Sequence, residues 1–110
     1  MQVGDLAKKR VFSVVHLADE ANREITRPYC CDFLSVAMSR APIGCAWVTV
    51  TANVNTLAVA SLRQAACVIL AEGMRLDEDT IKKARAHKIT VFATDLPAFE
   101  AALAVQEFLK

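Results

Sequence analysis

Three short apolar runs, separated by helix-like segments, constrain the fold of this chain more than any other feature. The runs cover residues 45–50, 67–70 and 88–93, and the helix-like segments between them cover 53–64 and 77–87. The runs are largely continuous instead of alternating, which is typical of strands covered on both faces. Parallel neighbours need a crossover connection, which is usually a helix. The pattern therefore predicts an α/β domain, with a mostly parallel sheet and flanking helices.

The N-terminal part of the chain predicts a pair of strands appended to this sheet. Residues 10–16 and 24–29 have strand-like patterns. Pro28 has no backbone N–H to donate, which places the second strand at a sheet edge. Asp32 is a good residue to cap the helix that follows. With 110 residues the chain can close one core but not two, so we expect residues 1–110 to form a single domain.

Composition and charge exclude several classes of partner. The formal net charge is +1, so the broad positive field that drives non-specific nucleic-acid binding is missing. No stretch reaches the roughly 18 apolar residues of a membrane span, and no export signal opens the chain. We therefore expect a cytoplasmic protein that binds neither nucleic acid nor membranes.

One predicted helix carries more apolar surface than a single sheet can cover. The chain is 55% apolar, and the segment 57–62 is apolar nearly all round. Excess apolar surface on a small chain usually meets a second copy of the same chain. This segment therefore predicts a homodimer.

Polar residues follow each of the three apolar runs. They are Thr49, Thr51, Asn53 and Asn55 after the first run, Glu72 and Gly73 after the second, and Thr94 and Asp95 after the third. Parallel strands end at one edge of a sheet, where open α/β sheets bind ligands, and helix N-termini favour anions. We expect a small anionic ligand or a nucleotide there. The alternative is that Asn53 and Asn55 only cap a helix and that Glu72 and Asp95 are surface charges.

Signatures of catalysis and of metal binding are missing from the sequence. Gly4, Gly44 and Gly73 are too far apart to form a phosphate-cradling loop. No nucleophile accompanies the carboxylates that could act as acid and base. We therefore predict no catalytic residues, no metal and no cofactor, and the sequence favours binding over catalysis.

The four cysteines do not have the paired spacing of a zinc or cluster site. Cys45 and Cys67 begin apolar runs, where cysteine behaves as a small hydrophobe, so we expect both thiols to be buried. Cys30 and Cys31 are adjacent and lie close to a predicted loop. Buried or half-buried thiols explain this pair as well, and the alternative is a redox-sensitive or iron–sulfur-related role.

Several segments of the chain resemble the DRTGG domain family. The resemblance begins with Asn22, Arg23 and Thr26 in the segment 22–26, and it continues with Asp32 in Asp-Phe-Leu-Ser. It extends through 47–50, 55–62, 66–73, 89–91 and 99–100. The resemblance implies an α/β fold similar to the N-terminal domains of HPr kinase/phosphorylase and of the Mur ligases. It also implies a regulatory or dimerising module without catalysis.

The chain departs from the family motif at two places. Arg27 and Pro28 stand where the family has two glycines, and Asn22 stands where it has aspartate. Proline removes the backbone freedom that glycine offers, so a contact made by the family glycines is changed in this chain. Stand-alone members of the family are often encoded near iron hydrogenase or redox genes. The alternative function is therefore a small-molecule or nucleotide-binding subunit of a metabolic or redox enzyme system, working through Thr51, Asn53, Asn55, Glu72 and Asp95.

Overall fold

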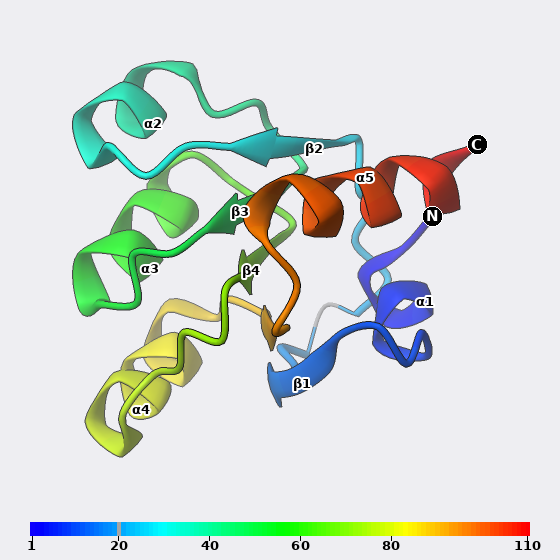
Figure 1. Ribbon diagram of the computed structural model, residues 1–110. Coiled ribbons are helices and arrows are strands. Elements are labelled where there is room, and N and C mark those ends of the chain that lie inside the picture. The colour runs from blue at the N-terminus through cyan, green and yellow to red at the C-terminus, as the bar shows by residue number, and fades with distance from the viewer. Residues whose placement is uncertain (20) are drawn as a thin grey trace.

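The computed structural model contains a five-stranded sheet between two layers of helices (Figure 1). It describes residues 1–19 and 21–110. The strands are β1 Ser13–His16, β2 Arg27–Cys30, β3 Cys45–Thr49, β4 Cys67–Leu70 and β5 Val91–Ala93. The helices are α1 Val3–Ala7, α2 Leu34–Arg40, α3 Val54–Leu62, α4 Glu78–His87 and α5 Ala98–Leu109.

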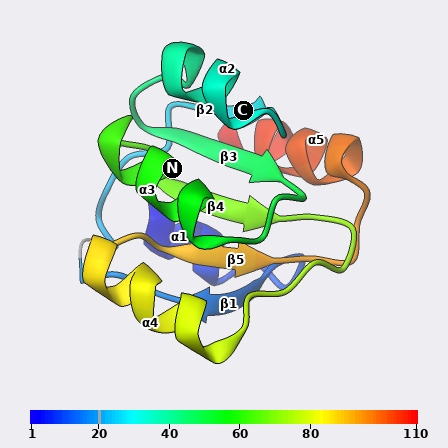
Figure 2. The ribbon, with the colours of Figure 1, turned by 90° about the vertical axis from the view of Figure 1, so that its left-hand side faces the viewer.

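The strand order is β1-β5-β4-β3-β2, and β2 to β5 are parallel to one another. The crossover helices α2, α3 and α4 lie on one face, and α1 and α5 cover the other (Figure 2). This arrangement confirms the predicted α/β class. We call the edge where β2 to β5 end the carboxyl edge, and the opposite edge, where they begin, the amino edge.

The two N-terminal strands do not pair with each other, so the predicted strand pair is wrong. β1 lies antiparallel to β5 at one side of the sheet, while β2 lies parallel to β3 at the other. The residue pattern marks both segments as strands, but it carries no information on which distant strand each will meet. Pro28 does lie on an edge strand, as predicted.

Alternate residues of the central strands enter two separate cores. Trp47 and Val68 pack toward α2, α3 and α4, whereas Val48 and Ile69 pack toward α1 and α5. All four side chains are buried. Burial on both faces explains why these strands read as continuous apolar runs.

Helix α3 is covered more completely than its sequence suggests. It lies in the middle of the helical layer, between α2 and α4 (Figure 2). Leu57 and Ala60 are buried, and the exposed large side chains are at its two ends, Val54 and Leu62. Neighbouring helices therefore cover much of the apolar surface that, from the sequence, is expected to meet a second copy.

In the part of the chain that the structure describes, every helix is too short or too polar to cross a lipid bilayer.

Candidate functional site

The carboxyl edge brings the predicted ligand-binding residues together from three strand ends. The ends of β3, β4 and β5 are in register, with Thr49 beside Leu70 and Leu70 beside Ala93. Beyond the strands, the Ala71 N–H donates to the Thr49 carbonyl oxygen at 3.0 Å. The Gly73 N–H donates to the Thr94 carbonyl oxygen at 3.0 Å. The loops that follow these strands are therefore bonded directly to one another.

Asp32 ties the end of β2 to the end of β3. Its Oδ1 accepts from the Thr49 hydroxyl at 2.8 Å and from the Val50 N–H at 3.0 Å. Its carbonyl oxygen accepts from the Thr51 hydroxyl at 3.2 Å. The predicted cap of the following helix is wrong, because Phe33 occupies the N-cap position of α2 and the Asp32 carboxylate is already engaged. Asp32 therefore acts here as a brace between strands.

Asn53 caps α3, as the simpler interpretation of this segment predicts. Its Oδ1 accepts from the Asn55 N–H at 2.9 Å and from the Thr56 N–H at 3.2 Å. The Thr56 hydroxyl donates to the Thr51 carbonyl oxygen at 2.6 Å. Two backbone donors that would face an anion are thus taken by the cap. The Asn55 side chain is exposed on the first turn of α3.

Glu72 and Gly73 form a tight turn that holds the glutamate in a strained backbone conformation. Their φ angles are +60° and +76°, and the Met74 N–H donates to the Ala71 carbonyl oxygen at 3.1 Å, as in a type I′ turn. A left-handed backbone costs a non-glycine residue about 1–2 kcal/mol. The Glu72 carboxylate offsets part of this cost, since Oε2 accepts from the Ala98 N–H at 3.1 Å, at the positive N-terminus of α5.

Replacing Glu72 tests this balance. We expect Glu72→Ala to lower the free energy of unfolding by about 1 kcal/mol, because the cap is lost while the backbone strain remains. Glu72→Gly loses the same cap but removes the strain, so it should be more stable than Glu72→Ala by about 1 kcal/mol. Urea denaturation of both variants measures the difference. Equal stability of the two would show that the turn carries no strain.

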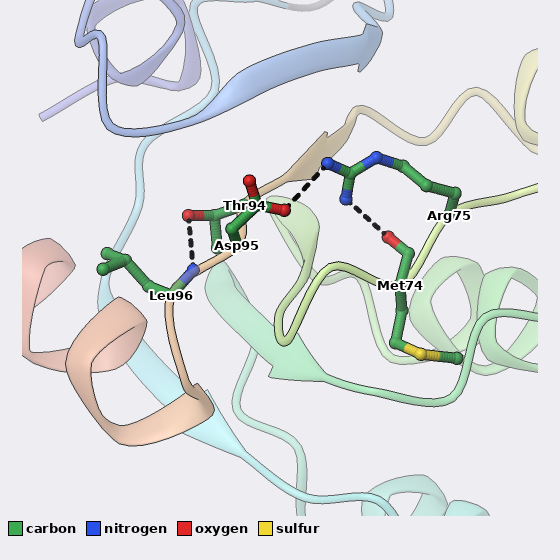
Figure 3. A network of polar contacts seen from close by, with 5 residues as sticks. All are labelled: Met74, Arg75, Thr94, Asp95 and Leu96. Carbon is green, nitrogen blue, oxygen red and sulfur yellow. Dashed lines mark hydrogen bonds and ion pairs between the residues drawn. The ribbon is translucent and has the colours of Figure 1, made fainter.

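Thr94 and Asp95 occupy the loop after β5. The buried Thr94 hydroxyl oxygen accepts from the Leu96 N–H at 3.2 Å. The Asp95 carboxylate pairs with Arg75 Nη2 at 3.2 Å, and Arg75 Nη1 donates to the Met74 carbonyl oxygen at 3.0 Å (Figure 3). Both charged side chains of this pair are more than half exposed, so the pair contributes little to stability.

The carboxyl edge is acidic. The loops that follow β2 to β5 and the first turns of α4 and α5 carry Asp32, Glu72, Asp77, Glu78, Asp79, Asp95 and Glu100. Acidic residues are favourable at helix N-termini, and the crossover helices all begin at this edge. Within these loops and first turns, Arg75 is the basic residue. Such a surface favours an uncharged or cationic group over a bare phosphate.

The residues that carry the family resemblance are divided between the two edges. Arg23 and Thr26 lie at the amino edge, whereas Asp32 lies at the carboxyl edge. The Thr26 N–H donates to the Gly44 carbonyl oxygen at 2.8 Å, and Arg23 Nη2 donates to the Gln64 carbonyl oxygen. These contacts tie together the segments that lead into β2, β3 and β4. Asn22, just before them, is exposed.

A cavity of about 450 Å³ opens where β1 and α4 end, away from the predicted site. It is lined by His16, Leu17, Ala18, Asp19, Arg85 and Lys88. The His16 Nδ1–H donates to the Ile89 carbonyl oxygen at 2.8 Å, which fixes the ring. The sequence did not predict this cavity, because its lining comes from segments about 70 residues apart, and a lone histidine in a strand was the available signal.

No cluster of three or more histidine, cysteine or acidic side chains is arranged to hold a metal ion within residues 1–19 and 21–110. Cys45 and Cys67 are buried, as predicted. Burial raises the pKa of Cys45 to about 11 and raises the pKa of Cys67 as well. Cys30 is exposed and Cys31 half-buried, where the Cys31 thiol donates to the Phe33 carbonyl oxygen at 3.3 Å.

The reactivity of Cys30 tests the redox interpretation. Partial burial, and then the neighbouring Asp32 charge, raise the pKa of Cys30. Less of this thiol is therefore ionised at pH 7, and the thiolate is the reactive form. In a Cys31→Ser variant at pH 7, we expect iodoacetamide to modify Cys30 more slowly than it modifies free cysteine. The same variant with Cys30→Ser added is the blank. Faster modification would favour a redox role.

Comparison with solved structures shows which fold this is. The chain is similar to the crystal structure of the CBS and DRTGG domains of the regulatory region of Clostridium perfringens pyrophosphatase, complexed with its activator, diadenosine tetraphosphate. The TM-score is 0.70 over 86% of this chain and 40% of that chain. The chain has a DRTGG-like fold. The sequence identity is 14%, so the likeness is one of fold. No protein-family model matches the chain, and no curated protein is detectably similar in sequence.

In this DRTGG-like fold, the departure from the family motif lies in the edge strand. Arg27 and Pro28 are the first two residues of β2, where Arg27 is in register with Cys45 and Pro28 with Ala46. Arg27 is exposed. An arginine thus stands on the surface of the amino edge.

Proposed function

We propose that this chain is a non-catalytic regulatory module that senses a small ligand in the cytoplasm and works as a homodimer. The observation that carries the proposal is the DRTGG-like fold, which it shares with a pyrophosphatase regulatory region that was crystallised with a nucleotide activator. The chain corresponds to less than half of that structure, so the ligand is part of the proposal. Asp32, Thr94 and Glu72 are bonded to other groups of the chain, so the proposal gives them a structural role and assigns binding to the exposed Asn55.

We place the ligand at the carboxyl edge, against the start of α3. Asn55 offers an exposed amide there, with both donor and acceptor atoms. The acidic surroundings favour the uncharged parts of a ligand, and the base and sugar of a nucleotide carry such groups. We therefore expect Asn55 to contact the nucleoside portion of the ligand.

Thermal denaturation with added ligands tests this site. Diadenosine tetraphosphate, ATP and adenosine are the probes, because adenosine shares the nucleoside but has no charge. A ligand present at about a hundred times its dissociation constant adds roughly 2.7 kcal/mol of stability. We expect adenosine to stabilise the wild type and Asn55→Ala to lose that response.

Gln106→Ala is the matched control, since it also removes an exposed amide but lies on α5. It should respond to adenosine as the wild type does. If none of the three compounds stabilises the wild type, or if Asn55→Ala responds fully, the proposed ligand site is wrong.

The homodimer is proposed to form along β2. In the described part of the chain β2 pairs with β3 on one side, which leaves the other side of the strand as a sheet edge. Helices α2 and α5 flank this edge from the two faces of the sheet (Figure 1). Phe33, just before α2, is 68% exposed, and Phe99, on α5, is 70% exposed. Large exposed apolar side chains near the open side of an edge strand are typical of an interface.

Sedimentation at micromolar concentration tests the dimer. We expect the wild type to sediment as a dimer and Phe99→Asp to sediment as a monomer. Leu62→Asp is the matched control, because Leu62 is 68% exposed but lies at the far end of α3. A monomeric wild type would refute the dimer, and dissociation caused by Leu62→Asp alone would refute its location.

A further inference from the structure

Four arginines gather at the amino edge, opposite the acidic carboxyl edge. Arg23 precedes β2, Arg27 begins it, Arg40 ends α2 and Arg63 is the C-cap of α3. We call these residues the arginine cluster. Helices α2 and α3 run against the strands and therefore end at this edge, where basic residues are favourable. The net charge of +1 is therefore the sum of two sheet edges of opposite charge and the rest of the chain.

The backbone brings three members of the arginine cluster, Arg27, Arg40 and Arg63, to one face of the sheet. Arg27 is in register with Cys45 on the neighbouring strand. Side chains alternate along a strand, so Arg27 lies on the same face as Tyr29. Tyr29 packs into the core beneath α2 and α3. Arg27 is therefore on the face where α2 ends with Arg40 and α3 ends with Arg63.

Two members of the cluster are held by backbone carbonyl groups. Arg63 donates to the Ala41 carbonyl oxygen from Nε at 3.1 Å and from Nη2 at 2.9 Å. Arg23 donates from Nη2 to the Gln64 carbonyl oxygen. A carbonyl group orients a guanidinium without neutralising it. Each guanidinium has five N–H donors, so most remain available for another partner.

Three charges of the cluster act on the same buried thiol, that of Cys45. Arg23, Arg27 and Arg63 all lower the pKa of the buried Cys45 thiol, although burial has the larger effect and raises it. Among the described residues, no carboxylate lies within 4.0 Å of any arginine of the cluster. Glu24, next to Arg23 in the sequence, pairs instead with the N-terminal ammonium group at 3.3 Å.

Two exposed aliphatic side chains flank the cluster. Ile43 is 66% exposed in the turn before β3, and Leu62, next to Arg63, is 68% exposed. The Ile43 carbonyl oxygen accepts from the Thr26 hydroxyl at 2.9 Å, which fixes this turn against the start of β2. The amino edge therefore combines oriented cations with apolar surface.

We propose that the arginine cluster binds the phosphate chain of an organic polyphosphate, with Ile43 and Leu62 against its organic part. Guanidinium groups match phosphate oxygens in charge and in planar geometry, so several of them hold a phosphate chain better than isolated lysines do. Arg27 supplies one of these groups from the exposed start of β2. This site is separate from the carboxyl edge, and the inference does not depend on the proposed function.

Titration calorimetry of the full chain tests the site with ATP and tripolyphosphate, each at low and at 0.15 M salt. We expect Arg27→Gln with Arg40→Gln to weaken the binding of both compounds about tenfold or more, since each change removes a charge-assisted partner. Arg10→Gln with Lys82→Gln, at exposed positions ahead of β1 and on α4, also removes two charges and should leave binding unchanged. Affinity should fall as salt rises. Arg27 and Arg40 are both exposed, so the double variant should fold normally.

Backbone amide chemical shifts locate the bound compound. Changes on adding tripolyphosphate should centre on Gly44, Cys45 and Gln64. The inference is overturned if the double variant binds both compounds as the wild type does, or if the changes centre on Asn55. The second result would leave the proposed function standing. The inference is also overturned if a 20-nucleotide RNA binds more tightly than ATP and the double variant loses that binding. This result would indicate a nucleic-acid surface.

Discussion

Replacing Gly44 with alanine is expected to lower the free energy of unfolding by about 3 kcal/mol. Gly44 is buried with a φ of +78°. A Cβ there would lie 2.8 Å from Thr26 Cγ2 and 3.3 Å from the Glu24 carbonyl oxygen. The left-handed backbone costs alanine about 1–2 kcal/mol, and forcing a methyl group into a packed site costs about 1–3 kcal/mol. Both penalties apply here, so urea denaturation should show a large shift of the midpoint.

Two further variants separate the penalties at Gly44. Gly73→Ala has a similar φ, +76°, but its Cβ would meet Asp95 Oδ1 at an ordinary 3.4 Å, so it should lose only the backbone part. Adding Thr26→Ala to Gly44→Ala removes the closest clashing atom, and the double variant should lose less than the two single losses added together. If Gly44→Ala and Gly73→Ala cost the same, the close packing of Gly44 against Thr26 is not important.

Trp47→Ala should destabilise the protein still more, by about 3–5 kcal/mol. Trp47 is fully buried in the middle of β3, and its Nε1–H donates to the Cys31 carbonyl oxygen at 2.8 Å. Alanine leaves a large cavity and an unpaired carbonyl group together. Domains of this size have a total stability of about 5–15 kcal/mol, so the variant will be partly unfolded at moderate temperature. Circular dichroism during thermal denaturation measures the loss.

Trp47→Phe divides this loss into its two parts. Phenylalanine fills most of the space but cannot donate to Cys31, so we expect a stability between those of the wild type and Trp47→Ala. Leu103→Ala is the surface control, because Leu103 is 45% exposed on α5 and its loss should be small. A Trp47→Ala variant no less stable than Leu103→Ala would contradict the observed core.

The sequence predicts the centre of the sheet well because the information there is local. The runs at 45–50 and 67–70 become β3 and β4, since both faces of each strand are buried and leave a continuous apolar signature. The caps of α3 and α4 are predictable for a similar reason. A capping side chain bonds to backbone within three residues, and Asn53 and Asp77 do so.

Edges and long-range bonds could not be predicted in the same way. β1 and β2 have similar strand patterns, yet they join opposite sides of the sheet, because their partners are set by packing of distant segments. The sequence pattern predicts that Asp32 caps a helix, but its carboxylate accepts hydrogen bonds from Thr49 and Val50 instead. A pattern of single residues does not show such competition between partners.

In the candidate sites, too, some features could be predicted from the sequence and others could not. The sequence predicts that Thr49, Glu72 and Thr94 meet at one edge, because parallel strands must end together. It does not show that Glu72 serves the start of α5. Nor does it show that Arg23 and Arg63, which are forty residues apart, lie near the same buried thiol. Both facts depend on contacts between loops.

Because the two sheet edges carry opposite charges, we expect contacts between copies of the chain to depend on ionic strength. At low salt, we expect the acidic edge of one copy to attract the basic edge of the next, and head-to-tail contacts of this kind build open chains wherever their rotation does not close a ring. Screening over about 10 Å at 0.1 M salt weakens this attraction. The proposed pairing along β2 would instead be made by apolar side chains and closed by two-fold symmetry, so we expect it to persist in salt. Light scattering across a salt gradient would therefore report two modes of self-association, reversible chains at low ionic strength and discrete pairs at high.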